Sequence, residues 1–217
     1  HLAQSFDVIV PEHPGFGGSD QPAWLCTVGD LARFYQKFLG RLQISNVHLV
    51  GTSLGGWIAA ELAALDGRPF CALTLIAAAG LQAPGVAAED LFQMTPQEML
   101  QRSYADPERV QRLLAMPPDP HEIARQQKNR GTLELLGRAN RMTDPTLRDR
   151  LQGISVPTML IWGEQDGIIK PQVGEAYRDA IPGATLHVLG GCAHLPHVES
   201  MHDTAALVLE HHRRATR

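Results

Sequence analysis

A serine in a glycine-rich segment has the surroundings of a nucleophile. The pentapeptide Gly51-Thr52-Ser53-Leu54-Gly55 follows a short apolar segment and precedes an alanine-rich segment that predicts a helix beginning at Leu54. A serine in a tight turn between a strand and a helix must adopt a strained backbone conformation, which small neighbours permit. We expect Gly51, Gly55 and Gly56 to provide the room. The helix start would offer N–H groups to a developing negative charge.

The same pentapeptide has two other interpretations, tight packing and a phosphate cradle. A phosphate site fits less well, because no lysine follows the glycines as in a P-loop and no Gly-x-Gly-x-x-Gly opens the helix. Tight packing stays open on the pentapeptide alone, so the nucleophile hypothesis needs partners elsewhere in the chain.

A serine nucleophile needs a base to take its proton and an acid to orient that base. Asp166 and His194 meet this need, because each follows an apolar, strand-like segment within a glycine-containing loop. Glu164 competes for the role of the acid, and His197 competes for the role of the base. The chain order is Ser, Asp, His, which differs from the orders in chymotrypsin and subtilisin.

Short apolar segments bounded by Gly or Pro predict the strands of a buried, mostly parallel sheet. They are residues 6–10, 47–50, 73–77, 156–162 and 184–189. Helices are expected between them, with Thr27 and Asp30 as a capping pair for a helix that extends to about residue 42. Further helices are expected at residues 171–180 and 202–211. This alternation predicts an α/β fold with helices on both faces of the sheet.

Residues 81–150 interrupt the alternation, because they contain no convincing strand and many prolines. Two helix starts stand out there, Thr95-Pro96-Gln97-Glu98 and Asp106-Pro107-Glu108, each with a cap residue followed by proline. We expect a helical cap at 81–150 that covers the carboxyl edge of the sheet, and a core formed by 1–80 and 151–217.

Four segments in order carry a family resemblance. They are Pro11 to Asp20, Val50 to Gly56, Leu160 to Asp166 and His194 to Glu199. The first resembles an Asp-x-Pro-Gly-x-Gly-x-Ser motif, with Glu12 in place of Asp. The chain therefore resembles the α/β-hydrolase superfamily, specifically its cap-bearing branch of serine esterases and carbon-carbon bond hydrolases.

The resemblance implies Ser53 as nucleophile, His194 as base, Asp166 as acid and the Leu54 N–H as an oxyanion-hole donor. In that family a His-Gly-type loop after the third strand gives a second donor, whereas this chain begins at His1, just before the fourth-strand equivalent. We therefore expect an N-terminally truncated fold, with a sheet edge that another segment or subunit, as in a homo-oligomer, would cover.

Composition limits the kinds of molecule that this protein is expected to bind. The 217 residues carry a formal net charge of -4 without a long basic run, which argues against nucleic acid and an anionic membrane surface. The absence of a long apolar stretch or a secretion signal predicts a soluble, cytoplasmic protein. Three widely spaced cysteines suggest no disulfide framework. A zinc site at Cys192 with His187, His194 and His197 matches no usual spacing, so no metal or organic cofactor is expected.

These patterns predict a serine hydrolase that cleaves small hydrophobic carboxylic esters through an acyl-enzyme intermediate. Carbon-carbon bond cleavage of the meta-cleavage type is the alternative reaction. The serine would attack the carbonyl carbon of an ester in the first reaction and of a ketone in the second. A non-catalytic ligand-binding protein on the same scaffold is the alternative from another class. The candidate pocket-lining residues of the cap, many of which we expect to form the cap's own core, are Leu91, Phe92, Met94, Met99, Leu100, Leu113, Leu114 and Met116.

Overall fold

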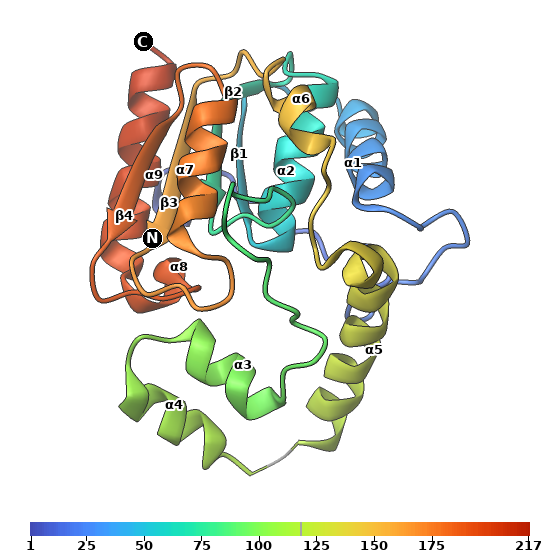
Figure 1. Cartoon of the computed structure of the whole chain (residues 1–217). Coiled ribbons are helices and arrows are strands. Elements are labelled where there is room, and N and C mark those ends of the chain that lie inside the picture. The colour runs from blue at the N-terminus through green and yellow to red at the C-terminus, as the bar shows by residue number, and fades with distance from the viewer. Residues whose placement is uncertain (118) are drawn as a thin grey trace.

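The computed structural model describes residues 1–117 and 119–217. Within them, a four-stranded sheet has its strands side by side in chain order, and every neighbouring pair is parallel (Figure 1). The strands are β1 (Val47–Thr52), β2 (Phe70–Ile76), β3 (Thr158–Gly163) and β4 (Thr185–Leu189). The predicted α/β fold is confirmed.

Helices cover both faces of this sheet. Alternate residues of a strand point to opposite faces, and on β3 Leu160 and Trp162 join the larger core whereas Met159 and Ile161 join a smaller one. The larger core is formed with α1 (Val28–Leu42), α2 (Leu54–Leu65), α6 (Leu147–Leu151) and α7 (Pro171–Ala180). The smaller core is formed with α9 (Met201–Ala215), which packs on β2.

Local sequence signals explain where these helices begin and end. Thr27 and Asp30 form the predicted capping box of α1, each accepting a hydrogen bond from the other's backbone N–H. The left-handed conformation of Gln43 ends that helix. Pro171 occupies the first turn of α7, whose predicted bounds are confirmed.

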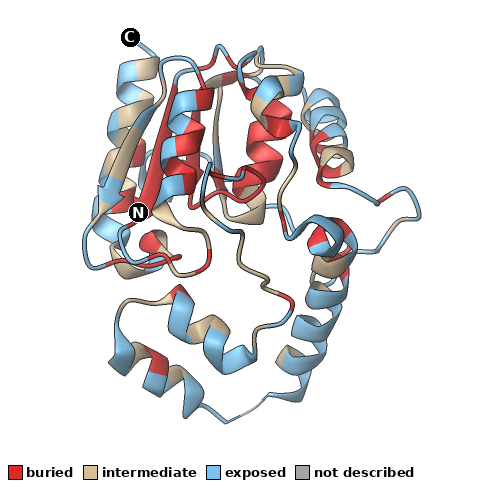
Figure 2. Ribbon diagram, in the orientation of Figure 1, coloured by how far each residue is buried: buried red, intermediate tan, exposed pale blue. Residues whose placement is uncertain are grey.

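The connection from β2 to β3 is helical, as expected. It contains α3 (Pro96–Ser103), α4 (Pro107–Leu114), α5 (Pro120–Gly137), the 3-10 turn η2 (Arg138–Asn140) and α6. Thr95 caps α3 with Glu98 in a capping box, and Asp106 caps α4. Buried residues concentrate in β2, β3 and α2, whereas most of α4 and α5 is exposed (Figure 2). The division into core and cap stays a prediction.

The prediction of a strand at residues 6–10 is wrong. Apart from the turn η1 (Leu2–Gln4), the chain before α1 forms no helix or strand, and Val10 is 85 % exposed. A strand exists only where a neighbour pairs with its backbone, and none of the described residues pairs with this segment. Phe6 instead packs its ring edge-on against His48 and His212.

The sheet is open at β1 and β4, and a partner subunit that covers an edge stays a prediction. Among the described helices, none combines the length and the apolar character that crossing a bilayer requires. The cytoplasmic location also stays a prediction. The short helix α8 (Pro196–Glu199) completes the fold between β4 and α9.

Candidate active site

Ser53 lies at the turn between β1 and α2 in a strained conformation. Its φ of 54° is unusual for a residue other than glycine. The surrounding backbone holds it there, because the Ser53 N–H donates to the Ile76 carbonyl at 2.9 Å and the Ser53 carbonyl accepts from the Ala79 N–H at 3.0 Å. Strain of this kind persists where neighbouring contacts enforce it, and it is common at functional sites.

Two of the three glycines expected to make room for this turn do so. A Cβ at Gly51 would lie 2.2 Å from the Gly55 carbonyl oxygen, and one at Gly56 would lie 2.6 Å from the Ala78 Cβ. For Gly55 the expectation is wrong, because a Cβ there would meet the His13 Nε2 at an ordinary 4.0 Å. Gly51 is needed because the backbone carbonyl of Gly55 occupies the place where a side chain at position 51 would lie.

The structure brings Ser53, His194 and Asp166 into one hydrogen-bonded chain. His194 Nε2 lies 3.0 Å from Ser53 Oγ, and His194 Nδ1 lies 2.9 Å from Asp166 Oδ2. Asp166 is only 2 % exposed and His194 only 7 %. A proton on Nδ1 directed at the carboxylate leaves Nε2 as an acceptor for the serine hydroxyl.

Asp166 is held in turn by the loop that follows it. Its second oxygen, Oδ1, accepts hydrogen bonds from the backbone N–H groups of Ile168 at 2.9 Å and Ile169 at 2.8 Å. Both carboxylate oxygens therefore have partners although the group is buried, which meets the requirement for burying a charge.

The two competing residues lie outside this chain of hydrogen bonds. His194 Nδ1 is bonded to Asp166 and not to Glu164, which is exposed. His197 lies close enough to His194 for charge repulsion to add to burial, and burial is the larger cause of its lowered pKa. Its Nδ1 is buried and finds no hydrogen-bond partner among the described residues.

His13 is a neighbour of the site that the sequence patterns did not single out. Its Nδ1 lies 2.6 Å from the Tyr35 hydroxyl, and its Nε2 faces the start of α2 beside Gly55. Burial lowers the pKa of His13 and raises the pKa of Tyr35 to about 12. The sequence signal that could have pointed to His13 was its place within the Pro11 to Asp20 segment. Its pairing with Tyr35 could not be predicted, because it depends on a tertiary contact.

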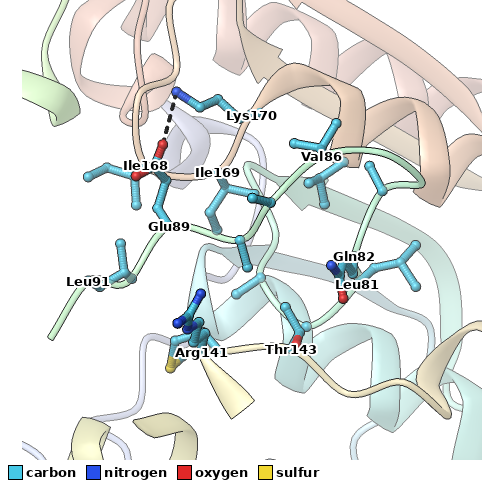
Figure 3. Close-up of a pocket in the computed structure, with 17 residues that line it drawn as sticks. Leu81, Gln82, Val86, Glu89, Leu91, Arg141, Thr143, Ile168, Ile169 and Lys170 are labelled. Carbon is cyan, nitrogen blue, oxygen red and sulfur yellow. Dashed lines mark ion pairs between the residues drawn. The ribbon is translucent and has the colours of Figure 1, made fainter.

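A pocket is lined by neighbours of the hydrogen-bonded chain, although Ser53, His194 and Asp166 are not among its lining residues (Figure 3). Its wall includes Ile168 and Ile169, whose N–H groups bind Asp166, and Ala79, whose N–H binds the Ser53 carbonyl. Glu89 pairs with Lys170 at 3.3 Å on its rim. Other apolar residues of the wall are Leu81, Ala83, Val86, Leu91 and Val173.

Most of the candidate pocket-lining residues of the cap lie away from this pocket. Of the eight apolar residues predicted to line a pocket, Leu91 alone is part of the wall of this one. Phe92 instead packs into the main core, whereas Leu114 and Met116 are exposed. Apolar spacing marks which residues avoid water, but not whether they face a core or a cavity.

The structure supplies no grouping suited to a metal ion. Within residues 1–117 and 119–217, no three His, Cys, Asp or Glu side chains are placed to bind one together. The three cysteines are free, and Cys192 is buried.

Residues 1–207 match the model of the alpha/beta hydrolase family. The chain belongs to this family. The match covers most of the chain, and together with the parallel sheet and its crossover helices it confirms the predicted resemblance. The family assignment supports hydrolase activity.

Similar proteins include hydrolases of more than one kind. Lipase 3 of Moraxella sp. (strain TA144) is 26% identical over 93% of this chain and 68% of its own length. The 2-hydroxy-6-oxononadienedioate/2-hydroxy-6-oxononatrienedioate hydrolase of Burkholderia vietnamiensis is 30% identical over 96% of this chain and 77% of its own. The crystal structure of a bacterial membrane phospholipase A has a TM-score of 0.74 and 27% identity, covering 94% of this chain and 69% of that one.

Proposed function

We propose that this protein is a serine hydrolase of small hydrophobic carboxylic esters, with Ser53 as the nucleophile. The observation that carries the proposal is the unbroken hydrogen-bonded chain from Ser53 through His194 to the buried Asp166. The strained backbone of Ser53 supports it, because folding alone gives no reason for a serine in that conformation.

Each group has a defined step. Ser53 Oγ attacks the ester carbonyl carbon while His194 Nε2 takes its proton, and Asp166 stabilises the imidazolium that forms. His194 then gives the proton to the alcohol oxygen as the carbon-oxygen bond breaks, leaving an acyl group on Ser53. Water attacks this acyl-enzyme with His194 as base, which releases the acid and restores the serine.

The Leu54 N–H is the proposed donor to the oxyanion. It is the first N–H of α2, and the first N–H groups of a helix have no acceptor within the helix. One oxyanion-hole donor contributes about 2.7 to 4 kcal/mol to catalysis. We assign no second donor of the His-Gly type within residues 1–117 and 119–217.

The pocket beside the site suits the apolar part of an ester. The aliphatic part of its wall would hold an acyl or alkyl group next to the Asp166 loop, and its polar residues include Glu89, Arg141 and Lys170. We propose that residues 81–150 act as the cap of the site, since Leu81, Val86 and Leu91 of this segment contribute to that wall. The similarity to lipases agrees with an ester substrate.

Carbon-carbon bond hydrolysis is the second candidate reaction. The observation that favours it is the 30% identity with the Burkholderia vietnamiensis hydrolase of an oxo-dienedioate. A non-catalytic binding protein is the third candidate, but it gives no reason for the complete Ser53, His194 and Asp166 arrangement.

Reaction with a fluorophosphonate probe and turnover of p-nitrophenyl acetate test the proposal. We expect the wild type to react with both, and Ser53→Ala to lose labelling and about 10⁴- to 10⁶-fold in kcat. Ser45→Ala, at an exposed serine outside the site, should behave as wild type. A wild type that neither labels nor turns over ester would contradict the proposed function. Turnover of a vinylogous diketone in preference to esters would favour the second candidate.

A further inference from the structure

The Glu199 carboxylate joins the segment before His194 to a segment that lies 94 positions before Glu199 in the chain. Its Oε1 accepts a hydrogen bond from the Ala105 N–H, and its Oε2 accepts one from the Ala193 N–H, both at 2.7 Å. Ala105 lies between α3 and α4, and Ala193 directly precedes His194. Both bonds are charge-assisted, and such bonds are roughly twice as strong as neutral ones.

Backbone contacts surround this carboxylate bridge. The His194 N–H donates to the Ser103 carbonyl at 3.1 Å, and the Gly167 N–H donates to the Arg102 carbonyl at 3.2 Å. The end of α3 therefore contacts the loops that carry both the imidazole and the acid. Arg109 of α4 adds a hydrogen bond from its Nη1 to the Val198 carbonyl at 3.3 Å.

The identity of Glu199 matters because both of its oxygens act as acceptors. Glutamine has the same shape but one acceptor oxygen, and its NH₂ group would face one of the two N–H donors. The loop before His194 also needs external support, since it contains Gly190 and Gly191, the latter at φ 68°. Without the bridge, the backbone ahead of the imidazole would keep fewer fixed contacts.

We propose that Glu199 is a positioning residue, which sets the place of His194 by fixing the Ala193 backbone against the segment after α3. The inference rests on the proposed function, because His194 is the base of that reaction. This role also makes the end of α3 a fixed part of the site. Moving that end away would break three hydrogen bonds together, those donated by the N–H groups of Ala105, His194 and Gly167.

Steady-state kinetics with p-nitrophenyl acetate compare Glu199→Ala, Glu199→Gln and wild type. A displacement of about 1 Å at a catalytic group costs about 10²-fold in rate. We therefore expect kcat to fall about 10²-fold in Glu199→Ala and less in Glu199→Gln, with KM unchanged in both. Glu175→Gln is the matched control, because this exposed carboxylate of α7 lies outside these contacts, and it should keep the wild-type kcat.

Amide hydrogen exchange and the His194 Nδ1–H resonance give a readout that does not need turnover. In both Glu199 variants the amides of Ala105 and Ala193 should exchange faster, and the Nδ1–H signal should weaken, while the amides of α1 keep their protection. Faster exchange in α1 as well would show general destabilisation and overturn the positioning role, as would a wild-type kcat in both variants. If wild type turns over no ester but the exchange and the Nδ1–H signal respond as expected, the proposed function fails while the placement of His194 by Glu199 stands.

Discussion

Two histidines, the buried His194 and the half-buried His48, differ in their partners. His194 has a carboxylate at one nitrogen and a serine hydroxyl at the other. His48, on β1, has the Thr74 hydroxyl 2.8 Å from its Nε2, whereas its Nδ1 is buried without a hydrogen-bond partner among the described residues. The His194 ring can receive a proton and share its charge with Asp166, whereas the contacts of His48 among the described residues are a hydroxyl and aromatic rings.

The neighbours of His48 are other imidazoles. The ring of His212 stacks on it at 5.7 Å between centroids, and the ring of His211 lies edge-on at 5.5 Å. Burial, with repulsion from these two rings, lowers the pKa of His48 to about 3. The comparison shows that the proposed catalytic histidine differs from His48 in its carboxylate partner and in its deeper burial.

The largest expected effect comes from removing that carboxylate. In Asp166→Asn we expect kcat for p-nitrophenyl acetate to fall about 10⁴-fold, because an amide neither selects the Nδ1–H tautomer nor stabilises the imidazolium. Asp7→Asn, at an exposed position, is the control. A loss of less than tenfold in Asp166→Asn would show that the partner of His194 does not distinguish it from His48.

An intermediate effect is expected at His48 in acid. Because its pKa is lower in the folded protein than the ordinary 6.5, the unfolded chain takes up a proton first. Stability contributed by neutral His48 is complete above about pH 6.5 and is lost as the pH falls toward 3. Between pH 7 and pH 4.5 we expect this loss to be on the order of 2 kcal/mol.

Urea unfolding at those two pH values measures the loss. His48→Gln should be less sensitive to acid than wild type by that amount, because glutamine has no proton to gain. The exposed His121 supplies the control His121→Gln, which should keep the wild-type difference. Equal acid sensitivity in wild type and His48→Gln would contradict the lowered pKa of His48. The rings of His211 and His212 lie beside it, and the Cys71 thiol lies close to His212.

The smallest effect is expected from the hydroxyl partner of His48. Thr74 is fully buried, so Thr74→Val would leave the second ring nitrogen without a partner at nearly constant volume. We expect a loss of about 1 to 3 kcal/mol in the free energy of unfolding at pH 7. Thr74→Ser keeps the hydroxyl and should retain part of that stability; if serine is no better than valine, the hydrogen bond contributes nothing.

The sequence predicts local features of this molecule well. Ser53, Asp166 and His194 each follow a short apolar strand, and parallel strands bring their carboxyl ends to one edge, so their assembly could be expected before the structure. The starts of α3 and α4 were likewise indicated by Thr95 and Asp106, because a cap acts within a few residues.

Features that depend on distant partners could not be read from local patterns. The apolar residues 6–10 have strand propensity, but pairing requires a neighbour that propensity does not supply. The roles of Glu199 and His13 depend on residues far along the chain, Ala105 and Tyr35 respectively. The local sequence around Glu199 and around His13 therefore does not indicate these roles, apart from the family resemblance.

The left-handed backbone of Ser53 has a consequence for the evolution of stability at this position. Glycine adopts a φ of 54° without the steric cost that any side chain incurs, so the turn would fold more favourably with glycine than with serine. The most stable residue here is therefore not the one that the chain carries. Selection for thermal stability alone would favour glycine at position 53 and abolish the proposed activity. A serine at this position therefore indicates selection for catalysis at the expense of stability.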